Sequence, residues 1–281
     1  MKTLILAAIR CSLIFTAAAA LSFAVAPADG DTLYEATNSG DLLSHDFGTL
    51  NTSTGVFTSI NSGGSALSGL GSTGDGRLYG IALFGSTLYQ INPVTGVQTA
   101  VGNGAISMFA FGATTAGLYA LNLHAGGGMD LYSINRTNGS STLIGPTGLT
   151  AVNAVGMSSN ASVLYLTNDT GLYSLDTTTG AAQFIGNTGE LIGAMVLSSG
   201  QLYAGVETPL RLDTLNPMTG DPTAGPNVTG TTQFFWGLAT TAVPESGGTL
   251  LLFFAALAPL LMLRRANSGR SLPRVSLPHQ A

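Results

Sequence analysis

The chain has 281 residues, of which only 8% are charged, and its formal net charge is −5. Between residues 29 and 242, three arginines stand against thirteen carboxylates, so this part carries a net charge of −10. A chain so poor in basic residues has no electrostatic footprint for DNA or RNA, and no nucleic-acid partner is expected. The single cysteine, Cys11, precedes residue 29, which excludes disulfides and cysteine-ligated metals from this part.

Residues 1–28 have the layout of a secretory signal peptide. Lys2 and Arg10 precede an apolar stretch from 11 to 26, and small residues around Ala26 offer cleavage sites. We therefore expect the mature chain to be exported and to begin near Asp29.

A turn signature recurs through residues 29–242 and predicts an all-β repeat fold. It opens with Asn or Asp and closes with Gly, at residues 51–55 (NTSTG), 92–96 (NPVTG), 135–139 (NRTNG), 176–180 (DTTTG) and 216–220 (NPMTG). The closing glycines are 41, 43, 41 and 40 residues apart. The opening side chain can accept backbone hydrogen bonds, and the glycine can adopt a left-handed conformation. Apolar residues flank each turn, so each repeat contains a hairpin.

A Leu-Tyr pair ahead of each hairpin predicts a further strand per repeat. The pairs are Leu33-Tyr34, Leu78-Tyr79, Leu118-Tyr119, Leu164-Tyr165 and Leu202-Tyr203. Apolar segments rich in small residues, at 106–112, 151–157 and 192–197, predict a fourth strand before most of these pairs. Four strands in about 40 residues are typical of a β-propeller blade.

The first repeat begins directly at Leu33, without a strand of its own before it, whereas residues 233–240 (QFFWGLAT) form a strand without a hairpin. We expect this C-terminal strand to complete the first blade, which removes exposed sheet edges. The prediction is a β-propeller of five four-stranded blades over residues 29–242. A β-solenoid with the same period is the main rival.

The C-terminal tail has three parts: a short polar motif, an apolar run from 249 to 263, and a basic stop at Arg264 and Arg265. The motif consists of Val243, Pro244, Glu245, Ser246 and Gly247. As a helix, the 15-residue run would be about 22 Å long, shorter than a comfortable bilayer span. The arginines favour the cytoplasmic side. An ordinary membrane anchor is the alternative to a processed one.

This tail resembles the PEP-CTERM family of sorting signals, in its VPDSG-like variant, with Glu245 in the place of Asp. The resemblance covers residues 243–265 and implies a Gram-negative surface protein that an exosortase processes. It implies a transient inner-membrane anchor at 243–265, followed by a basic tail at 266–281, and delivery to the cell surface, outer membrane or extracellular matrix.

No catalytic motif occurs in the sequence. Loops at a propeller's channel mouth usually carry the ligand contacts, and here these positions include Ser107, Asn153, Glu190 and Gln233. Glu190 with Asn153 is a sparse version of the calcium sites of propeller lactonases, a likeness at the level of the fold alone. A second, looser calcium hypothesis rests on Asn160, Asn168 and Asp169, although turn chemistry explains these residues too.

Two further residue groups admit a functional and a structural interpretation. His45 and His124 are the histidines outside the tail, and their separation offers no metal-ligand spacing. Phe234, Phe235 and Trp236 could stack on sugar rings, but alternation along the strand requires some of them to pack in the core.

The sequence therefore predicts an exported β-propeller that acts as a non-catalytic structural or binding module, with no resident cofactor. Exopolysaccharide and surface proteins are its expected partners besides the exosortase. A hydrolase or lactonase with a channel-mouth site, with or without calcium, is the alternative.

Overall fold

The computed structural model describes residues 32–38, 45–73, 75–153 and 155–241, and these contain strands and turns but no helix. The described strands, in chain order, are β1 (Thr32–Asn38), β2 (His45–Asn51), β3 (Phe57–Asn61), β4 (Leu67–Ser72), β5 (Leu78–Ala82), β6 (Gly85–Ile91), β7 (Gln98–Met108), β8 (Ala110–Ala113), β9 (Leu118–Leu123), β10 (Gly128–Ile134), β11 (Ser141–Thr150), β12 (Val155–Ser159), β13 (Leu164–Asn168), β14 (Gly171–Leu175), β15 (Ala182–Asn187), β16 (Ile192–Ser198), β17 (Gln201–Glu207), β18 (Leu210–Leu215), β19 (Pro222–Thr223) and β20 (Phe234–Ala239).

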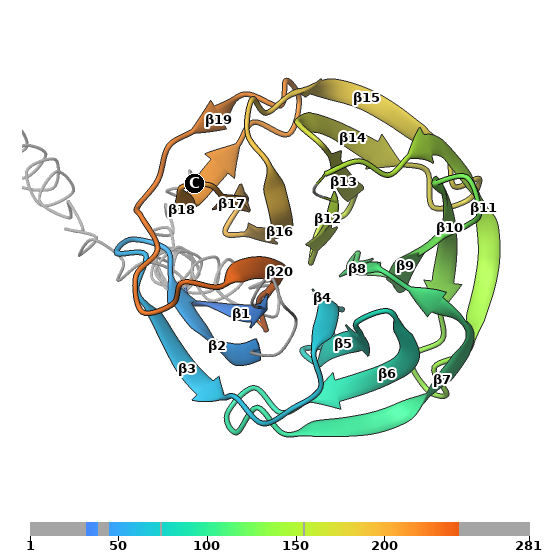
Figure 1. The fold of residues 1–281 in the computed structure, drawn as a ribbon, viewed down its shortest axis with the longest axis horizontal. Helices are drawn as coiled ribbons and strands as arrows, with labels where there is room; N and C mark the ends of the chain where they lie inside the picture. Colours follow the sequence, from blue (N-terminus) through green and yellow to red (C-terminus); the bar gives the residue numbers. More distant parts are fainter. Residues whose placement is uncertain (1–31, 39–44, 74, 154, 242–281) are drawn as a thin grey trace, which may run out of the picture.

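The strands form antiparallel groups of four. Their orders are β20-β1-β2-β3, β4-β5-β6-β7 and β8-β9-β10-β11, with β12-β13-β14-β15 and β16-β17-β18-β19 joined into one sheet. The joint is a short parallel pairing of β12 with β16, at Ser158 with Met195 and Ser159 with Val196. Figure 1 shows the groups around a common centre, with β4, β8, β12, β16 and β20 closest to it. The fold is all-β and propeller-like.

The strand that completes the first sheet comes from the far end of the described chain. β20 pairs antiparallel with β1, from Tyr34 with Ala239 to Asn38 with Phe234. This pairing was predicted from the sequence and is confirmed. It covers the inner edge of β1, which would otherwise present unpaired backbone groups.

The five hairpins have the predicted chemistry. In the first, Asn51 Oδ1 accepts hydrogen bonds from the backbone N–H of Ser53 and Thr54, at 3.0 and 2.9 Å. Gly55 closes the turn with φ +69° and donates its N–H to the Asn51 carbonyl. The other closing glycines also have positive φ, at Gly96, Gly139, Gly180 and Gly220. In the fourth turn, hydrogen bonds from Thr178 lower the pKa of Asp176.

Glycines allow the innermost strands to approach one another closely. A Cβ on Gly112 of β8 would lie 2.4 Å from the Ser158 carbonyl oxygen of β12, so no larger residue fits without displacement of the backbone. One glycine in each innermost strand meets the next innermost strand in this way: Gly69, Gly112, Gly156, Gly193 and Gly237. The last of these, in β20, lies against Gly69 and Leu70 of β4.

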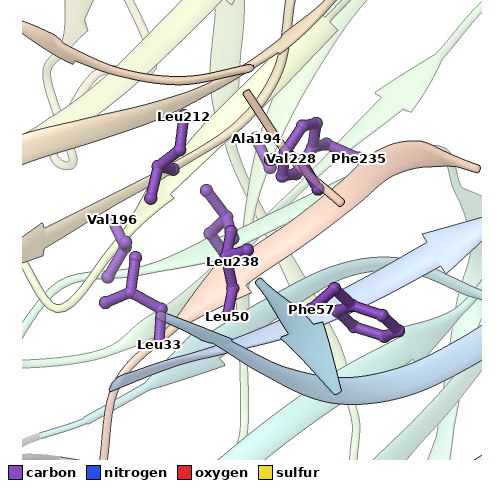
Figure 2. Packing of buried hydrophobic residues seen from close by; sticks show 9 residues of the cluster. All are labelled: Leu33, Leu50, Phe57, Ala194, Val196, Leu212, Val228, Phe235 and Leu238. Carbon is purple, nitrogen blue, oxygen red and sulfur yellow. The ribbon is translucent and has the colours of Figure 1, made fainter. Parts of the chain in front are cut away.

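The hydrophobic core consists of clusters between neighbouring groups of strands. Figure 2 shows one of them, to which the first sheet contributes Leu33, Leu50 and Phe57. The last group contributes Ala194, Val196 and Leu212, and β20 contributes Phe235 and Leu238. Similar clusters lie between each of the other neighbouring pairs. A buried side chain of this size stabilises the fold by about 1.5–3 kcal/mol, so these clusters hold adjacent groups together.

Two predicted innermost strands begin later than the sequence suggested. The predicted segment 106–112 is divided between the end of β7 and β8, and residues 151–154 of the segment 151–157 precede β12. In the first case the reason is that β7 continues to Met108, inside the predicted segment. β7 pairs with β6 as far as Met108 with Gly85. In the second case, residues 151–153 form a loop between β11 and β12, in which the Val152 N–H is bonded to the Asn168 side chain. The third such segment, 192–197, lies within β16 as predicted.

An extended segment before β20 connects the last group to the first sheet. Leu212 donates its N–H to the Pro226 carbonyl, and Phe57 of β3 donates its N–H to the Thr229 carbonyl. Beside this segment, Arg211 binds both oxygens of the buried Asp213 carboxylate, at 2.5 and 2.7 Å. Asp213 also accepts the N–H of Gly225 at 3.0 Å, so the ion pair fastens the segment to β18.

Several predictions fall outside the described residues. These are the signal peptide at 1–28, the sorting motif Val243 to Gly247, the apolar run at 249–263, Arg264 and Arg265, and the basic tail at 266–281. In the part of the chain that the structure describes, no helix has the length and apolar character to cross a membrane.

Candidate functional site

A cavity of about 340 Å³ opens where the innermost strands begin. Its lining comes from every group of strands. The residues are Ser68, Phe84, Phe109, Ala151, Val152, Asn153, Val155, Gly193, Glu207, Phe234, Phe235 and Trp236. Because the strands alternate in direction, this cavity lies at the opposite end of the sheets from the five Asn/Asp-to-Gly hairpins.

Aromatic side chains dominate the lining. Phe235 is buried in the core cluster between the first sheet and the last group, as the alternation along the strand predicted. Phe234 is 38% exposed and Trp236 is half-buried, so these two neighbours of Phe235 are accessible from the cavity. Phe109 lies at a corresponding point just before β8. Aromatic rings can hold the apolar faces or cationic groups of a ligand.

Phe84 is held at the rim in an unusual backbone conformation. It lies in the tight turn between β5 and β6 with φ +50°, a region that non-glycine residues rarely adopt, and its side chain is 59% exposed. Ser107 donates a hydrogen bond to the Phe84 carbonyl at 2.6 Å. Ser107, predicted as a ligand-binding residue, therefore supports the turn that carries Phe84 and is not among the lining residues.

The loop before β12 brings Val152 and Asn153 to the same rim. Asn168 holds this loop, because its side chain accepts the Val152 N–H at 3.1 Å and donates to the Thr150 carbonyl at 2.9 Å. Asn153 has φ +44° and donates its side-chain amide to Asp169 at 2.6 Å. Of the four predicted channel-mouth residues, Asn153 is the one that lines the cavity.

Glu207, at the end of β17, is the carboxylate in the lining. One of its oxygens would lie 2.5 Å from a Cβ on Gly193, so the absence of a side chain at Gly193 makes room for it. Burial raises the pKa of the Glu207 carboxyl above its ordinary value of 4.5. Among the described residues, no side chain donates a hydrogen bond to this carboxylate or forms an ion pair with it.

Ser68, near the start of β4, is a second polar side chain without a partner. It is 4% exposed, and its hydroxyl makes no hydrogen bond within the described part of the chain. Since an unpaired buried hydroxyl costs free energy, a ligand that reached it would gain a hydrogen bond.

The other two predicted residues make contacts elsewhere. Glu190 accepts a hydrogen bond from the Arg211 guanidinium at 2.9 Å, which makes it part of the ion-pair group on β18. Gln233 accepts a hydrogen bond from the Thr37 hydroxyl at 2.6 Å, beside the pairing of β20 with β1. The structure thus does not bring Glu190 and Asn153 together at the cavity.

The residues of the calcium and histidine hypotheses are also separated. Asn168 lies beside the start of β12, whereas Asn160 follows its end and donates to the Leu197 carbonyl. His45 contacts the Gly64 carbonyl, and His124 lies 3.9 Å from Asp130. In the described ranges, no group of three or more His, Cys, Asp or Glu residues is arranged to hold a metal ion.

Comparisons with known proteins give structural neighbours only. No family model and no curated protein matches the sequence. A chain from the crystal structure of a nidogen/laminin complex has 8% identity and a TM-score of 0.49, over 76% of this chain and 99% of that one. A structural genomics protein of unknown function from Bacteroides thetaiotaomicron VPI-5482 has 11% identity and a TM-score of 0.44. The match covers 69% of this chain and 50% of that one.

Sequence reasoning missed Phe84 and Glu207 as site residues. Phe84 stands before Gly85 in a short turn, which places a large aromatic residue where small polar ones usually occur. That mismatch was the available signal. For Glu207 the signal was its position at the end of a Leu-Tyr strand, the same end at which the channel-mouth loops were expected.

Proposed function

We propose that this protein is an exported, five-bladed β-propeller that serves as a non-catalytic binding module of the cell surface or extracellular matrix. The observation that carries the proposal is the convergence of all groups of strands on one cavity with accessible aromatic side chains. Ligand pockets are typically concave, largely apolar, and furnished with a few polar groups, and this cavity has those properties.

The closed five-bladed ring is the part of the proposal that concerns the fold. Supporting it, β20 contacts β16 on one side and β4 on the other, and core clusters lie between each neighbouring pair of groups. Native-state hydrogen exchange tests it. In a closed ring, the β20 amides should exchange only through global unfolding, whereas exchange from a low-energy local opening would contradict closure.

The proposed cellular location rests on the sequences of the two ends of the chain. We propose that the leader at 1–28 is removed and that an exosortase processes the motif Val243 to Gly247, because the tail resembles sorting signals of that class. Intact-mass measurement on protein fractionated from its own cells tests this. A surface species that ends near residues 243–248 supports it, and an inner-membrane species that retains residues 250–281 contradicts it.

Binding can be tested with the mature domain, residues 29–242, and washed cells or purified exopolysaccharide. Retention that falls after Trp236→Ala, with Met218→Ala as the control at an exposed hairpin, supports a binding module that acts through the cavity. Retention that does not depend on Trp236 places binding on another face. Calcium-dependent hydrolysis lost on changing Glu190 or Asn153 would instead favour the lactonase alternative.

A further inference from the structure

The cavity contains a carboxylate that no cation in the described protein neutralises. The three arginines between residues 29 and 242 are all engaged elsewhere: Arg77 and Arg136 lie 4.0 and 3.4 Å from Asp75, and Arg211 lies 2.9 Å from Glu190. No lysine occurs between residues 29 and 242. The Glu207 carboxylate therefore pays a desolvation penalty that a ligand could offset.

The surroundings of Glu207 favour one class of ligand. Phe84, Phe109, Phe234 and Trp236 line the same cavity, and aromatic side chains attract organic cations through the negative faces of their rings. No arginine, lysine or histidine is among the described residues of the lining, so nothing there repels a cation. An anion, by contrast, would meet an acidic protein with a carboxylate in the site.

A neutral sugar fits this lining less well than a cation does. A sugar ring presents several hydroxyl groups, each of which needs a hydrogen-bond partner when it is desolvated. Among the described lining residues, Ser68, Asn153 and Glu207 have polar side chains and Trp236 adds one indole N–H donor, while Asn153 already donates to Asp169. An alkylated ammonium group needs fewer partners, because an aromatic surface and one carboxylate satisfy it.

We propose that the cavity binds a ligand through an organic ammonium group, which lies against Glu207 and is surrounded by Trp236 and the phenylalanines. This inference rests on the proposed function, since it names the chemical class of the ligand for the same cavity. The cavity volume of about 340 Å³ is within the range of small-molecule sites.

Two probes of the same shape and different charge test the proposal. Choline carries a trimethylammonium group, and 3,3-dimethylbutan-1-ol carries a neutral tert-butyl group in its place. Trp236 is the only tryptophan of the chain, so its fluorescence reports directly on occupation of the cavity. We expect choline to bind the mature domain at least about tenfold more tightly than the neutral alcohol.

Substitutions assign that preference to Glu207. Glu207→Gln should weaken choline binding about tenfold and leave binding of the alcohol within about twofold. Asp221→Asn, at an exposed hairpin far from the cavity, removes the same charge and should change neither. Choline affinity should also fall as acid protonates Glu207, while that of the alcohol should stay constant.

Three results would each overturn the ammonium proposal. They are equal affinities for the two probes, no choline binding at concentrations on the order of 10 mM, and an unchanged preference for choline in Glu207→Gln. These failures are distinguishable from failure of the proposed function. If Trp236-dependent retention on cells or exopolysaccharide persists while choline shows no preference, the binding module stands and its ligand is not an ammonium compound.

Discussion

The two ends of the sheets differ in how closely their residues repeat from one group of strands to the next. At the hairpin end, each of the five turns places an Asn or Asp at its start and a left-handed glycine at its close. At the cavity end, the corresponding loops present unlike residues, among them Phe84, Val152, Asn153 and Glu207. Chemistry that every repeat shares serves the fold, since a single ligand site seldom needs the same residue in every repeat. Residues that occur once are the place to look for binding.

Two buried polar residues do not fit that division, because they occur once but lie outside the cavity lining. Glu35 occupies the strand position that other repeats fill with Gly80, Ala120, Leu166 or Ala204. Asp213 occupies the position of Tyr89, Tyr132 and Tyr173. If both prove purely structural, then non-repetition by itself does not indicate function.

The largest effect is expected at Glu35. Its carboxyl is fully buried without a hydrogen-bond partner in the described part, and burial raises its pKa to about 8. Between the ordinary value of 4.5 and about 8, the folded state holds a proton that the unfolded state has lost. Stability is therefore greatest below pH 4.5 for this group and falls by about 1.4 kcal/mol per pH unit as pH rises through that window.

Glu35→Gln should abolish this slope. Urea unfolding at pH 5, 6.5 and 8 measures it, with Glu35→Leu as a second variant because Leu166 fills the corresponding position in the fourth repeat. A wild-type slope that persists in both variants would assign the pH dependence to another group.

Arg211→Met should destabilise the fold by about 3–5 kcal/mol, because it leaves the Asp213 carboxylate buried without its counter-ion. The matched control is Arg136→Met, since Arg136 is half-exposed and its pairing with Asp75 is worth less than about 1 kcal/mol. Denaturant midpoints and slopes compare the two. Equal losses would mean that the Asp213 pair contributes no more than a surface pair.

Asn92→Ala tests the repeated end. It removes the side-chain acceptor for the N–H groups of Val94 and Thr95, and we expect a loss of about 1 kcal/mol. Asn92→Asp should retain most of the stability, because Asp176 performs the same role in the fourth turn. Thermal unfolding of the wild type, Asn92→Ala and Asn92→Asp tests this. An Asn92→Ala variant as stable as the wild type would show that Pro93 and Gly96 suffice for the turn.

Phe84→Gly tests the unrepeated end and should have the smallest effect on stability. Glycine relieves the positive φ but adds freedom to the unfolded chain, so the two changes offset each other to within about 1 kcal/mol. Choline binding, followed by Trp236 fluorescence, should nevertheless weaken several-fold. A variant that binds normally would remove Phe84 from the site, and a strongly destabilised one would show that its ring packs as core.

The sequence predicted the repeated features and missed most of the unrepeated ones. Asn-to-Gly turns and Leu-Tyr strands recur, so each instance supports the others, and the unpaired last strand identified its partner in β1. The beginnings of β8 and β12 were misplaced because apolar residues in sequence do not reveal where β7 ends or that residues 151–153 form a loop before β12. Asn153 was found from its loop position, whereas Phe84 and Glu207 depend on tertiary proximity that a single aromatic or acidic residue does not disclose.

The pairing of β20 with β1 also bears on the time course of folding. Thr37 and Gln233, which are bonded beside this pair, stand 196 residues apart. At the usual rates of protein synthesis, β1 is made roughly 10–40 s before its partner. During that interval the inner edge of β1 has no strand to pair with, which is the state in which edges associate with other chains. The first sheet is thus the earliest to be synthesised and the last that can be completed.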